Sequence, residues 1–198
     1  MTRNVAIFVF DEVEVLDMCG PFEVFSIAGM NDDPRPFNVF LVAEEMRPII
    51  ARHGFSANPH YTIEDCPKPD ILIVPGGYGT RREMQNKTII DWIRHTTKET
   101  EHTLSVCTGS LLLAKAGMLE GLEVTTHHLA FDLLRLSAPH AVIREGRRFL
   151  DNGKIITSGG IAAGIDASFY MVEKLLGAKV AQETAQYMEY AWQTAKEE

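Results

Sequence analysis

Residues Leu104–Ala114 read Leu-Ser-Val-Cys-Thr-Gly-Ser-Leu-Leu-Leu-Ala, in which small residues separate two apolar runs. The first run predicts a buried strand that ends at Cys107, and the second predicts a helix. The small residues permit a sharp turn from the strand into the helix, which lifts the side chain at its apex above the sheet edge. The segment therefore predicts an α/β fold with Cys107 at a nucleophile elbow.

Short apolar runs alternate with helical periodicity along the rest of the chain. This alternation is typical of a doubly wound, mostly parallel sheet with helices on both faces. The predicted strands are Val5–Phe10, Phe37–Ala43, Ile71–Val74, Thr103–Val106 and Ile155–Thr157, and the predicted helices are Pro21–Ala28, Thr88–Thr100, Gly109–Ala116, Leu129–Leu136, Ile165–Leu176 and Ala178–Ala191. Two segments with turn residues, Arg47–Tyr61 and Val142–Leu150, predict small hairpins or irregular excursions.

Length and charge limit the classes of function. A chain of 198 residues is long enough for one good core, so residues 1–198 are expected to form a single domain. The net charge of −8 and the absence of basic clusters argue against nucleic acid or an anionic membrane as a partner. No apolar run approaches the length of a membrane span. The expected partner is a small molecule.

Three cysteines without a Cys-x-x-Cys pair do not form a disulfide framework in a chain of this size. They are expected to be reduced thiols in a cytoplasmic protein. No set of His, Cys, Asp and Glu has a recognisable metal-ligand spacing, so the sequence predicts neither a metal nor another cofactor.

Cys107 is the candidate nucleophile. The helix that follows it directs free N–H groups and its positive dipole end at the sulfur, which favours the thiolate over the thiol. The alternative is that Cys107 is a small buried hydrophobe at a strand end, which is the commoner role of a lone cysteine. The local pattern alone leaves both interpretations open.

A glycine turn follows another predicted strand, in Pro75-Gly76-Gly77-Tyr78. Backbone N–H groups at Gly76 and Gly77 are expected to form an oxyanion-type hole that faces the cysteine, with Tyr78 in the pocket wall. The turn could equally be an ordinary tight turn.

Further candidate groups follow other strands. Asp17 precedes a helix predicted to open at Pro21, and it is either a general acid or base beside the thiol or a turn and capping residue. Of the pair His127-His128, one is expected to line the pocket as a proton relay and the other to lie at the surface. Gly160 lies in a glycine-rich loop that lacks both the P-loop lysine and the dinucleotide-binding pattern.

Together, these motifs resemble in their order those of isonitrile hydratases, which belong to the DJ-1/PfpI superfamily and are related to class I glutamine amidotransferases. The motifs are Leu16-Asp17-x-x-Gly20-Pro21, Pro75-Gly76-Gly77, Ser105-Val106-Cys107-Thr108-Gly109, Thr125-Thr126-His127 and Gly159–Asp166. The resemblance extends from Val5 to about Tyr190. It implies a flavodoxin-like fold and a homodimer.

The resemblance also implies a reaction, the hydration of an isonitrile to an N-substituted formamide. Cys107 would attack the isonitrile carbon and Asp17 would supply a proton. The Thr108 hydroxyl would then help Asp17 to orient water, and backbone N–H groups near Gly77 and Thr108 would stabilise developing charge.

Three departures from related patterns bear on substrate. Protease or amidase members carry His at the position of Thr108, and many deglycase-like members carry Glu at that of Asp17. The isonitrile hydratases that it resembles carry Trp where this chain has His128. The same motifs also occur in the amidase-like domain of AraC-type transcription regulators, and the chain is expected to stop near Ala191 without room for their DNA-binding domain. A non-enzymatic metabolite- or redox-sensing module is therefore the alternative function.

Overall fold

A seven-stranded sheet runs through the middle of the protein, in the order β10-β11-β7-β6-β1-β2-β5. The computed structural model describes residues 1–192. All pairings in this sheet are parallel except that of β10 with β11. The strands are β1 (Arg3–Phe8), β2 (Phe37–Ala43), β5 (Tyr61–Thr62), β6 (Ile71–Val74), β7 (His102–Val106), β10 (Phe149–Asp151) and β11 (Ile155–Ser158). The predicted mostly parallel α/β fold is confirmed.

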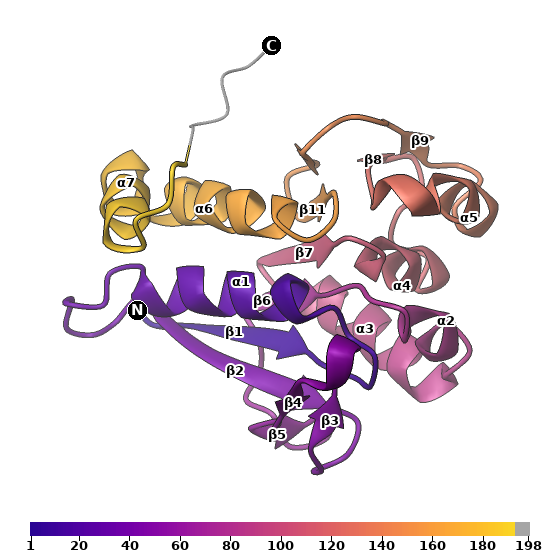
Figure 1. Cartoon of the computed structure of the whole chain (residues 1–198), viewed down its shortest axis with the longest axis horizontal. Coiled ribbons are helices and arrows are strands. Elements are labelled where there is room, and N and C mark those ends of the chain that lie inside the picture. Colours follow the sequence, from indigo (N-terminus) through magenta and orange to yellow (C-terminus); the bar gives the residue numbers. More distant parts are fainter. Residues whose placement is uncertain (193–198) are drawn as a thin grey trace.

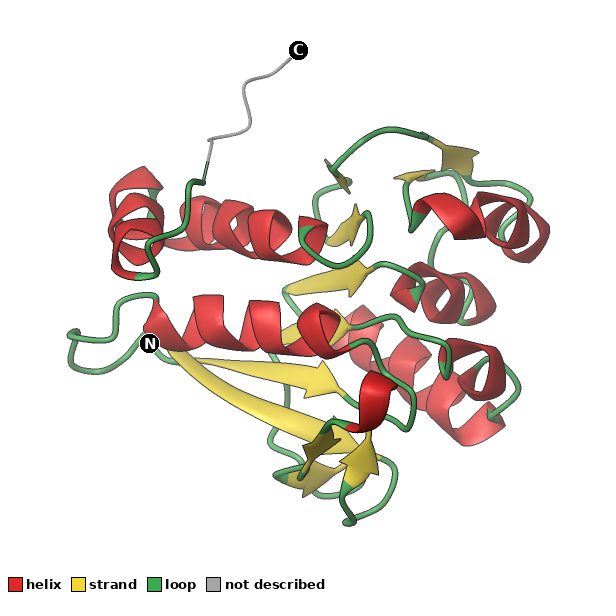
Figure 2. Ribbon diagram, viewed as in Figure 1, coloured by secondary structure: helices red, strands yellow, loops and turns green. Residues whose placement is uncertain are grey.

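Helices cover both faces of the sheet. One group consists of α1 (Val15–Ile27), α6 (Ala163–Leu176) and α7 (Ala178–Tyr187), and the other of α2 (Thr80–Glu83), α3 (Lys87–Glu99), α4 (Gly109–Lys115) and α5 (Phe131–Ser137). The arrowheads of β1 and β7 point toward the same end of the molecule, where loops follow them (Figures 1 and 2). Loops that are distant in sequence therefore meet at this end.

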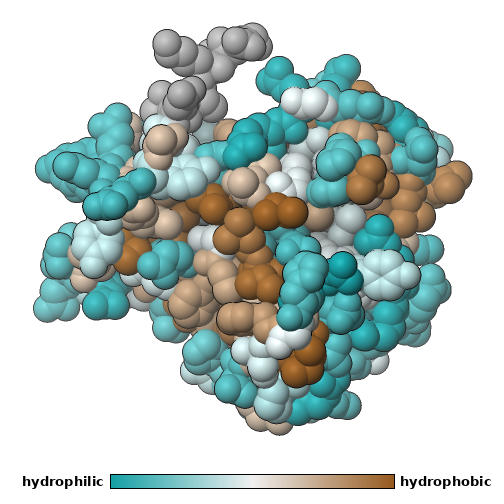
Figure 3. Space-filling view, in the orientation of Figure 1, coloured by the Kyte–Doolittle hydropathy of each residue, from teal (hydrophilic) through white to brown (hydrophobic). Residues whose placement is uncertain are grey.

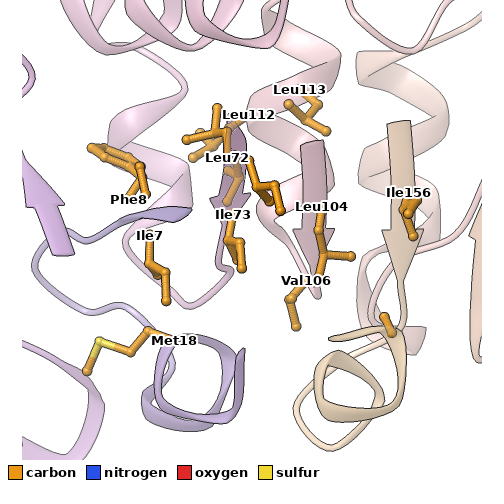
Figure 4. Packing of buried hydrophobic residues seen from close by; sticks show 14 of the residues in the cluster. Ile7, Phe8, Met18, Leu72, Ile73, Leu104, Val106, Leu112, Leu113 and Ile156 are labelled. Atoms are coloured by element: carbon orange, nitrogen blue, oxygen red, sulfur yellow. The ribbon is translucent and has the colours of Figure 1, made fainter. Parts of the chain in front are cut away.

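The core lies on both sides of the central strands. All four residues of β6 are fully buried, as expected for a strand of a parallel sheet that is covered on both faces. Figure 4 shows Leu112 and Leu113 of α4 on one side of these strands and Met18 of α1 on the other. This packing holds the carboxyl ends of the strands in fixed positions.

The first helix differs from its prediction. It begins at Val15 rather than at Pro21, which lies inside α1. Proline cannot donate to the carbonyl four residues earlier, which is that of Asp17, yet burial of Met18 and Val24 on α1 maintains the helix through this position. Asp17 consequently lies in the first turn of a helix and not in a loop.

The two predicted hairpin segments have different outcomes. Residues 47–61 contain the antiparallel pair β3 (Ile49–Ile50) and β4 (Ser56–Ala57), but Tyr61 enters β5 of the main sheet. At Val142–Leu150 the hairpin alternative is wrong, because β9 (Val142–Ile143) pairs in parallel with β8 (Glu123–Val124) and β10 pairs with β11, so the segment is an irregular excursion. Short strands carry no local signal for partners that are distant in sequence.

The observed ends of other helices also differ from the predicted ones. The segment predicted as Leu129–Leu136 begins with the 3-10 turn η2 (His128–Ala130) before α5, and α7 ends at Tyr187 rather than Ala191. A second 3-10 turn, η1 (Arg52–Gly54), joins β3 to β4. None of the helices in residues 1–192 combines the length and apolar character needed to cross a bilayer.

The turn at Gly109 supplies a test of the fold. A Cβ at this position would lie 1.9 Å from the Val74 carbonyl oxygen. Because backbone of a buried strand cannot yield, Gly109→Ala is expected to lower the free energy of unfolding by about 3 kcal/mol or more. Urea denaturation measures this change. Gly159→Ala is the control, since its Cβ would meet no atom closer than 3.5 Å, and an equal loss in both variants would contradict the steric explanation.

Candidate functional site

Cys107 lies at the apex of the turn between β7 and α4. Its φ of 57° is a left-handed conformation that is strained for a residue with a side chain. The turn is held by the Cys107 N–H, which donates to the Gly159 carbonyl (3.0 Å), and by the Thr126 hydroxyl, which donates to the Cys107 carbonyl (2.8 Å). The strand, turn and helix are therefore arranged as the sequence predicted.

Asp17 reaches the same place from α1. Its side chain is fully buried and accepts two backbone hydrogen bonds, from the Gly76 N–H to Oδ2 and from the Ile161 N–H to Oδ1, each 3.0 Å long. Asp17 and Cys107 are close enough that each shifts the pKa of the other. The carboxylate thus joins the start of α1 to the loops after β6 and β11, directly beside the thiol.

Burial controls the ionisation of this pair. It raises the pKa of Asp17 to about 7, although the two N–H donors act in the opposite direction. Burial, followed by the charge of Asp17, also raises the pKa of the Cys107 thiol, and hydrogen bonds from Thr108 lower it by less. The position of Cys107 at the start of α4 is therefore not sufficient to make the thiolate its favoured form. Because the groups are coupled, protonation of Asp17 removes the charge that opposes a thiolate at Cys107.

The glycine turn differs from the predicted oxyanion hole. The Gly76 N–H is occupied by Asp17, and the Gly77 N–H donates to the Thr108 hydroxyl (3.0 Å). A Cβ at Gly76 would lie 2.5 Å from the Thr108 nitrogen and 2.8 Å from the Cys107 Cβ, so the turn packs directly against the elbow. Its N–H groups hold the catalytic candidates in position and do not face an empty site.

Thr108 is buried within this network. Its hydroxyl oxygen lies 3.2 Å from the Gly77 carbonyl, to which it can donate, and 3.3 Å from the Thr80 hydroxyl, which donates to it. The hydroxyl also interacts with the Cys107 sulfur and lowers the pKa of the thiol. These partners place Thr108 as a residue that links the glycine turn to Cys107.

His127 and Gly160 complete the wall around the sulfur. A Cβ at Gly160 would lie 2.2 Å from the His127 Cδ2 and 3.3 Å from the Cys107 Sγ, so only glycine leaves room for both side chains. His127 Nδ1 accepts the Leu129 N–H (3.3 Å), which leaves Nε2 to carry the proton of the neutral ring. Burial and the neighbouring His128 lower the pKa of His127.

Tyr78 lies farther out than predicted, and His128 is the histidine at the surface. Tyr78 is 68% exposed and does not form the inner wall of the site. His128 is exposed, with its ring centroid 4.3 Å from that of His127. Of the two histidines, His127 therefore lies against the cysteine. The Ile161 N–H and the Thr126 hydroxyl were not foreseen, because nothing in their local sequence indicates contacts with Asp17 and Cys107.

A model of the DJ-1/PfpI family matches residues 3–174. The chain belongs to the DJ-1/PfpI family. It is 35% identical to an isonitrile hydratase of Pseudomonas putida over 191 residues, which cover 96% of this chain and 80% of that protein. The crystal structure of a ThiJ/PfpI family protein from Pseudomonas syringae superimposes with a TM-score of 0.88 at 26% identity and covers 99% of this chain and 78% of that one.

Regulators are also relatives of this DJ-1/PfpI protein. The HTH-type transcriptional regulator CdhR of Pseudomonas aeruginosa is 29% identical over 139 residues, which cover 70% of this chain. The match spans only 41% of the regulator's own length. Membership of the family is thus compatible with both an enzyme and a sensing domain.

A separate pocket of about 350 Å³ opens beyond β1 and β2. It is lined by residues such as Asp11, Arg47 and Arg82, and it includes none of the side chains predicted for the Cys107 site. Both arginines are already paired, since Arg47 binds Asp11 and Arg82 binds Glu83. Within residues 1–192, no group of three or more His, Cys, Asp or Glu is arranged to hold a metal ion.

The ionisation of Asp17 predicts a dependence of stability on pH. Its pKa of about 7 in the folded protein exceeds the ordinary value of 3.8, so folding favours the protonated form. This contribution is complete below pH 3.8 and is lost as the pH rises through 7, and it amounts to about 4 kcal/mol at most.

The free energy of unfolding of the wild-type protein is therefore expected to fall between pH 4 and pH 8 relative to that of Asp17→Asn. Urea denaturation of both proteins across this range measures the difference. A constant offset between the two curves, which the lost backbone hydrogen bond alone would produce, would show that Asp17 is ionised throughout.

Proposed function

We propose that this DJ-1/PfpI protein is a cysteine-dependent enzyme that hydrates an isonitrile to an N-substituted formamide. The observation that carries the proposal is the Asp17 carboxyl, with a pKa of about 7, beside the thiol of Cys107 at a strand-to-helix elbow. A carboxyl group with this pKa can both donate and accept a proton near neutral pH. The 35% identity to an isonitrile hydratase across most of the chain supports this choice of reaction.

The first chemical step forms a carbon–sulfur bond. The Asp17 carboxylate takes the proton of the Cys107 thiol as the sulfur adds to the terminal carbon of the isonitrile. Asp17 then delivers this proton to the same carbon, which gives a thioimidate with the structure R–N=CH–S. One proton and the sulfur have then been added, and Asp17 is left as a carboxylate. Covalent attachment divides one difficult hydration into two easier steps.

The second step consumes water. The Asp17 carboxylate takes a proton from water as the oxygen attacks the thioimidate carbon, and the imine nitrogen becomes N–H. Collapse of the tetrahedral adduct breaks the carbon–sulfur bond and releases R–NH–CHO. The second proton of the water passes to the nitrogen, and Asp17 returns its proton to the departing sulfur. The net reaction therefore adds one water to the isonitrile and restores the Cys107 thiol and the Asp17 carboxylate.

The surrounding residues serve this chemistry by position. Thr108, with its hydroxyl engaged by Gly77, is assigned the role of holding the elbow and its thiol in place. The neutral His127 ring, with its proton on Nε2, is assigned to a hydrogen bond with substrate or water beside the sulfur. Gly160 leaves the space that both groups require.

A metabolite-sensing domain is the second candidate function, and the similarity to CdhR favours it. A redox sensor has less support, because oxidation-prone cysteines have a low pKa and are accessible to solvent. Cys107 is only 6% exposed, and burial raises the pKa of its thiol. In a sensor, the same crevice would bind a small molecule without turning it over.

We further propose a cytoplasmic, single-domain protein that acts as a homodimer. All three cysteines are free thiols, and the elements pack around one continuous core. Hydrophobic residues gather over α1 and between α1 and α6 (Figure 3), where Leu16 is 37% and Ile161 40% exposed. A second copy that covers this face would remove these side chains from water beside Asp17.

Replacement of the two acting groups tests the proposed reaction. Cys107→Ala should reduce formamide production from simple isonitriles to background, and Asp17→Asn should lower it by about 100-fold or more, because amide groups do not transfer protons at neutral pH. Thr108→Val should give a smaller loss. Proton NMR of the formamide measures all three rates.

Cys66→Ala serves as the control, because it also removes one sulfur but lies outside the site. Formation of formamide by the Cys107→Ala protein at the wild-type rate would end the covalent mechanism. If the wild-type protein binds small metabolites but turns over no isonitrile, the sensing function takes its place.

The proposed dimer predicts a mass in solution of about twice the 22.1 kDa of the chain by light scattering. Leu16→Asp should shift the equilibrium toward the monomer, because it would bury a charge in the interface. Leu136→Asp is the control, since Leu136 is 82% exposed on α5, away from this face. A wild-type monomer, or equal dissociation by the two variants, would contradict the assignment of this face.

A further inference from the structure

One cation beside the glycine turn has no acidic partner. Arg81, in the first turn after the glycine loop, is exposed, and within residues 1–192 its guanidinium forms no ion pair with a carboxylate. Its Nη1 donates to the Gly77 carbonyl (3.2 Å) and to the Thr80 hydroxyl (3.1 Å). The side chain is therefore held in one position although no opposite charge holds it there.

These anchors belong to the network beside Cys107. The Gly77 carbonyl and the Thr80 hydroxyl are also partners of the Thr108 hydroxyl, and Thr108 follows the cysteine directly. Arg81 is thus two hydrogen bonds away from the elbow. Guanidinium groups carry five N–H donors, so those not used by the two anchors remain for another acceptor.

Tyr78 limits where the guanidinium can lie. The Arg81 Cζ is 5.8 Å from the centroid of the Tyr78 ring, and the Arg52 Cζ is 5.9 Å from it. The charge of Arg52 is balanced by Glu12 through an ion pair of 3.0 Å. Of these two arginines, Arg81 is the one whose charge is left for a bound molecule.

Arg81 is one of three charged or titratable groups that act on His127. Glu14, His128 and Arg81 all act on His127, and the effect of Arg81 is larger than the opposing effect of Glu14. The charge of Arg81 therefore reaches the ring of His127, which packs beside Gly160 and the Cys107 sulfur.

We infer that Arg81 binds a carboxylate on the molecule that reacts with Cys107, so that the site selects an anionic reactant. A planar guanidinium matches a carboxylate in geometry and can donate two parallel hydrogen bonds to it. The inference rests on the proposed function only in naming that reactant as an isonitrile that carries a carboxylate. Arg81 is a specificity residue and takes no part in bond making at the sulfur.

The alkylation of Cys107 tests the anion contact without any isonitrile. Iodoacetate and iodoacetamide deliver the same carbon to the sulfur, but only iodoacetate is charged. The ratio of their rates, followed at the Cys107 peptide by mass spectrometry because Cys19 and Cys66 are also free thiols, cancels changes in thiol reactivity.

Arg81→Gln is expected to lower the ratio of iodoacetate to iodoacetamide rates by about three- to tenfold, and Arg81→Lys should preserve most of it. Glu14→Gln should raise the ratio. In the wild-type protein the ratio should fall as salt rises from about 0.02 to 0.5 M, because salt screens the attraction. Arg35→Gln, which removes a charge from the loop before the opposite end of β2, is the control. Equal ratios for the wild-type protein and Arg81→Gln would overturn the inference.

A direct binding measurement covers the case in which the buried thiol alkylates too slowly. Acetate, but not acetamide, should shift the NMR signals of the His127 ring in the wild-type protein, and it should not do so in Arg81→Gln. Identical titrations of the two proteins with acetate would overturn the inference.

Kinetics with a matched pair of isonitriles separate this inference from the proposed function. An isonitrile that bears a carboxylate should have a KM at least about fivefold lower than its methyl ester, and Arg81→Gln should remove this difference with little change in kcat. Turnover of both compounds with equal KM in both proteins would leave the hydratase function intact and refute the role of Arg81. Absence of turnover, with an alkylation ratio that depends on Arg81, would refute the hydratase and retain the anion contact.

Discussion

The buried carboxylate of Asp17 is the constraint on which the site depends. A carboxylate in a core is costly unless hydrogen bonds compensate it, and here N–H groups of Gly76 and Ile161 do so from loops that are 85 residues apart in the chain (161 − 76). The same two bonds fix the start of α1 against the ends of β6 and β11. The hydrogen bonds that stabilise the buried Asp17 carboxylate therefore also position the loops around the Cys107 thiol.

Burial also changes the pKa values of Asp17 and Cys107. Desolvation moves the pKa of Asp17 to about 7, where the group exchanges protons readily, and its negative charge raises the pKa of the adjacent thiol. A proton that leaves one group therefore changes the acidity of the other. For a reaction that adds a proton and a nucleophile to the same carbon, such coupling supplies both from one pair.

The residues around Asp17 and Cys107 form an inner layer, which packs against the elbow and His127, and an exposed outer layer. Gly76 and Gly160 are small because a Cβ would collide with the elbow or with His127, so these residues determine the shape of the inner site. Tyr78, Arg81 and His128 have exposed side chains and lie outside this inner layer. Residues of this outer layer can change with substrate while the inner layer and its chemistry persist.

Local pattern in the sequence determined the parallel sheet, the elbow at Cys107 and the candidate status of Asp17, because apolar runs and small turn residues act on their immediate neighbours. The tertiary structure alone decided the partners. It assigned the N–H groups of Gly76 and Gly77 to Asp17 and Thr108, and it raised the pKa of a thiol that the helix was expected to acidify. Hydrogen-bond partners and burial depend on segments distant in sequence, and only the folded chain brings those segments together.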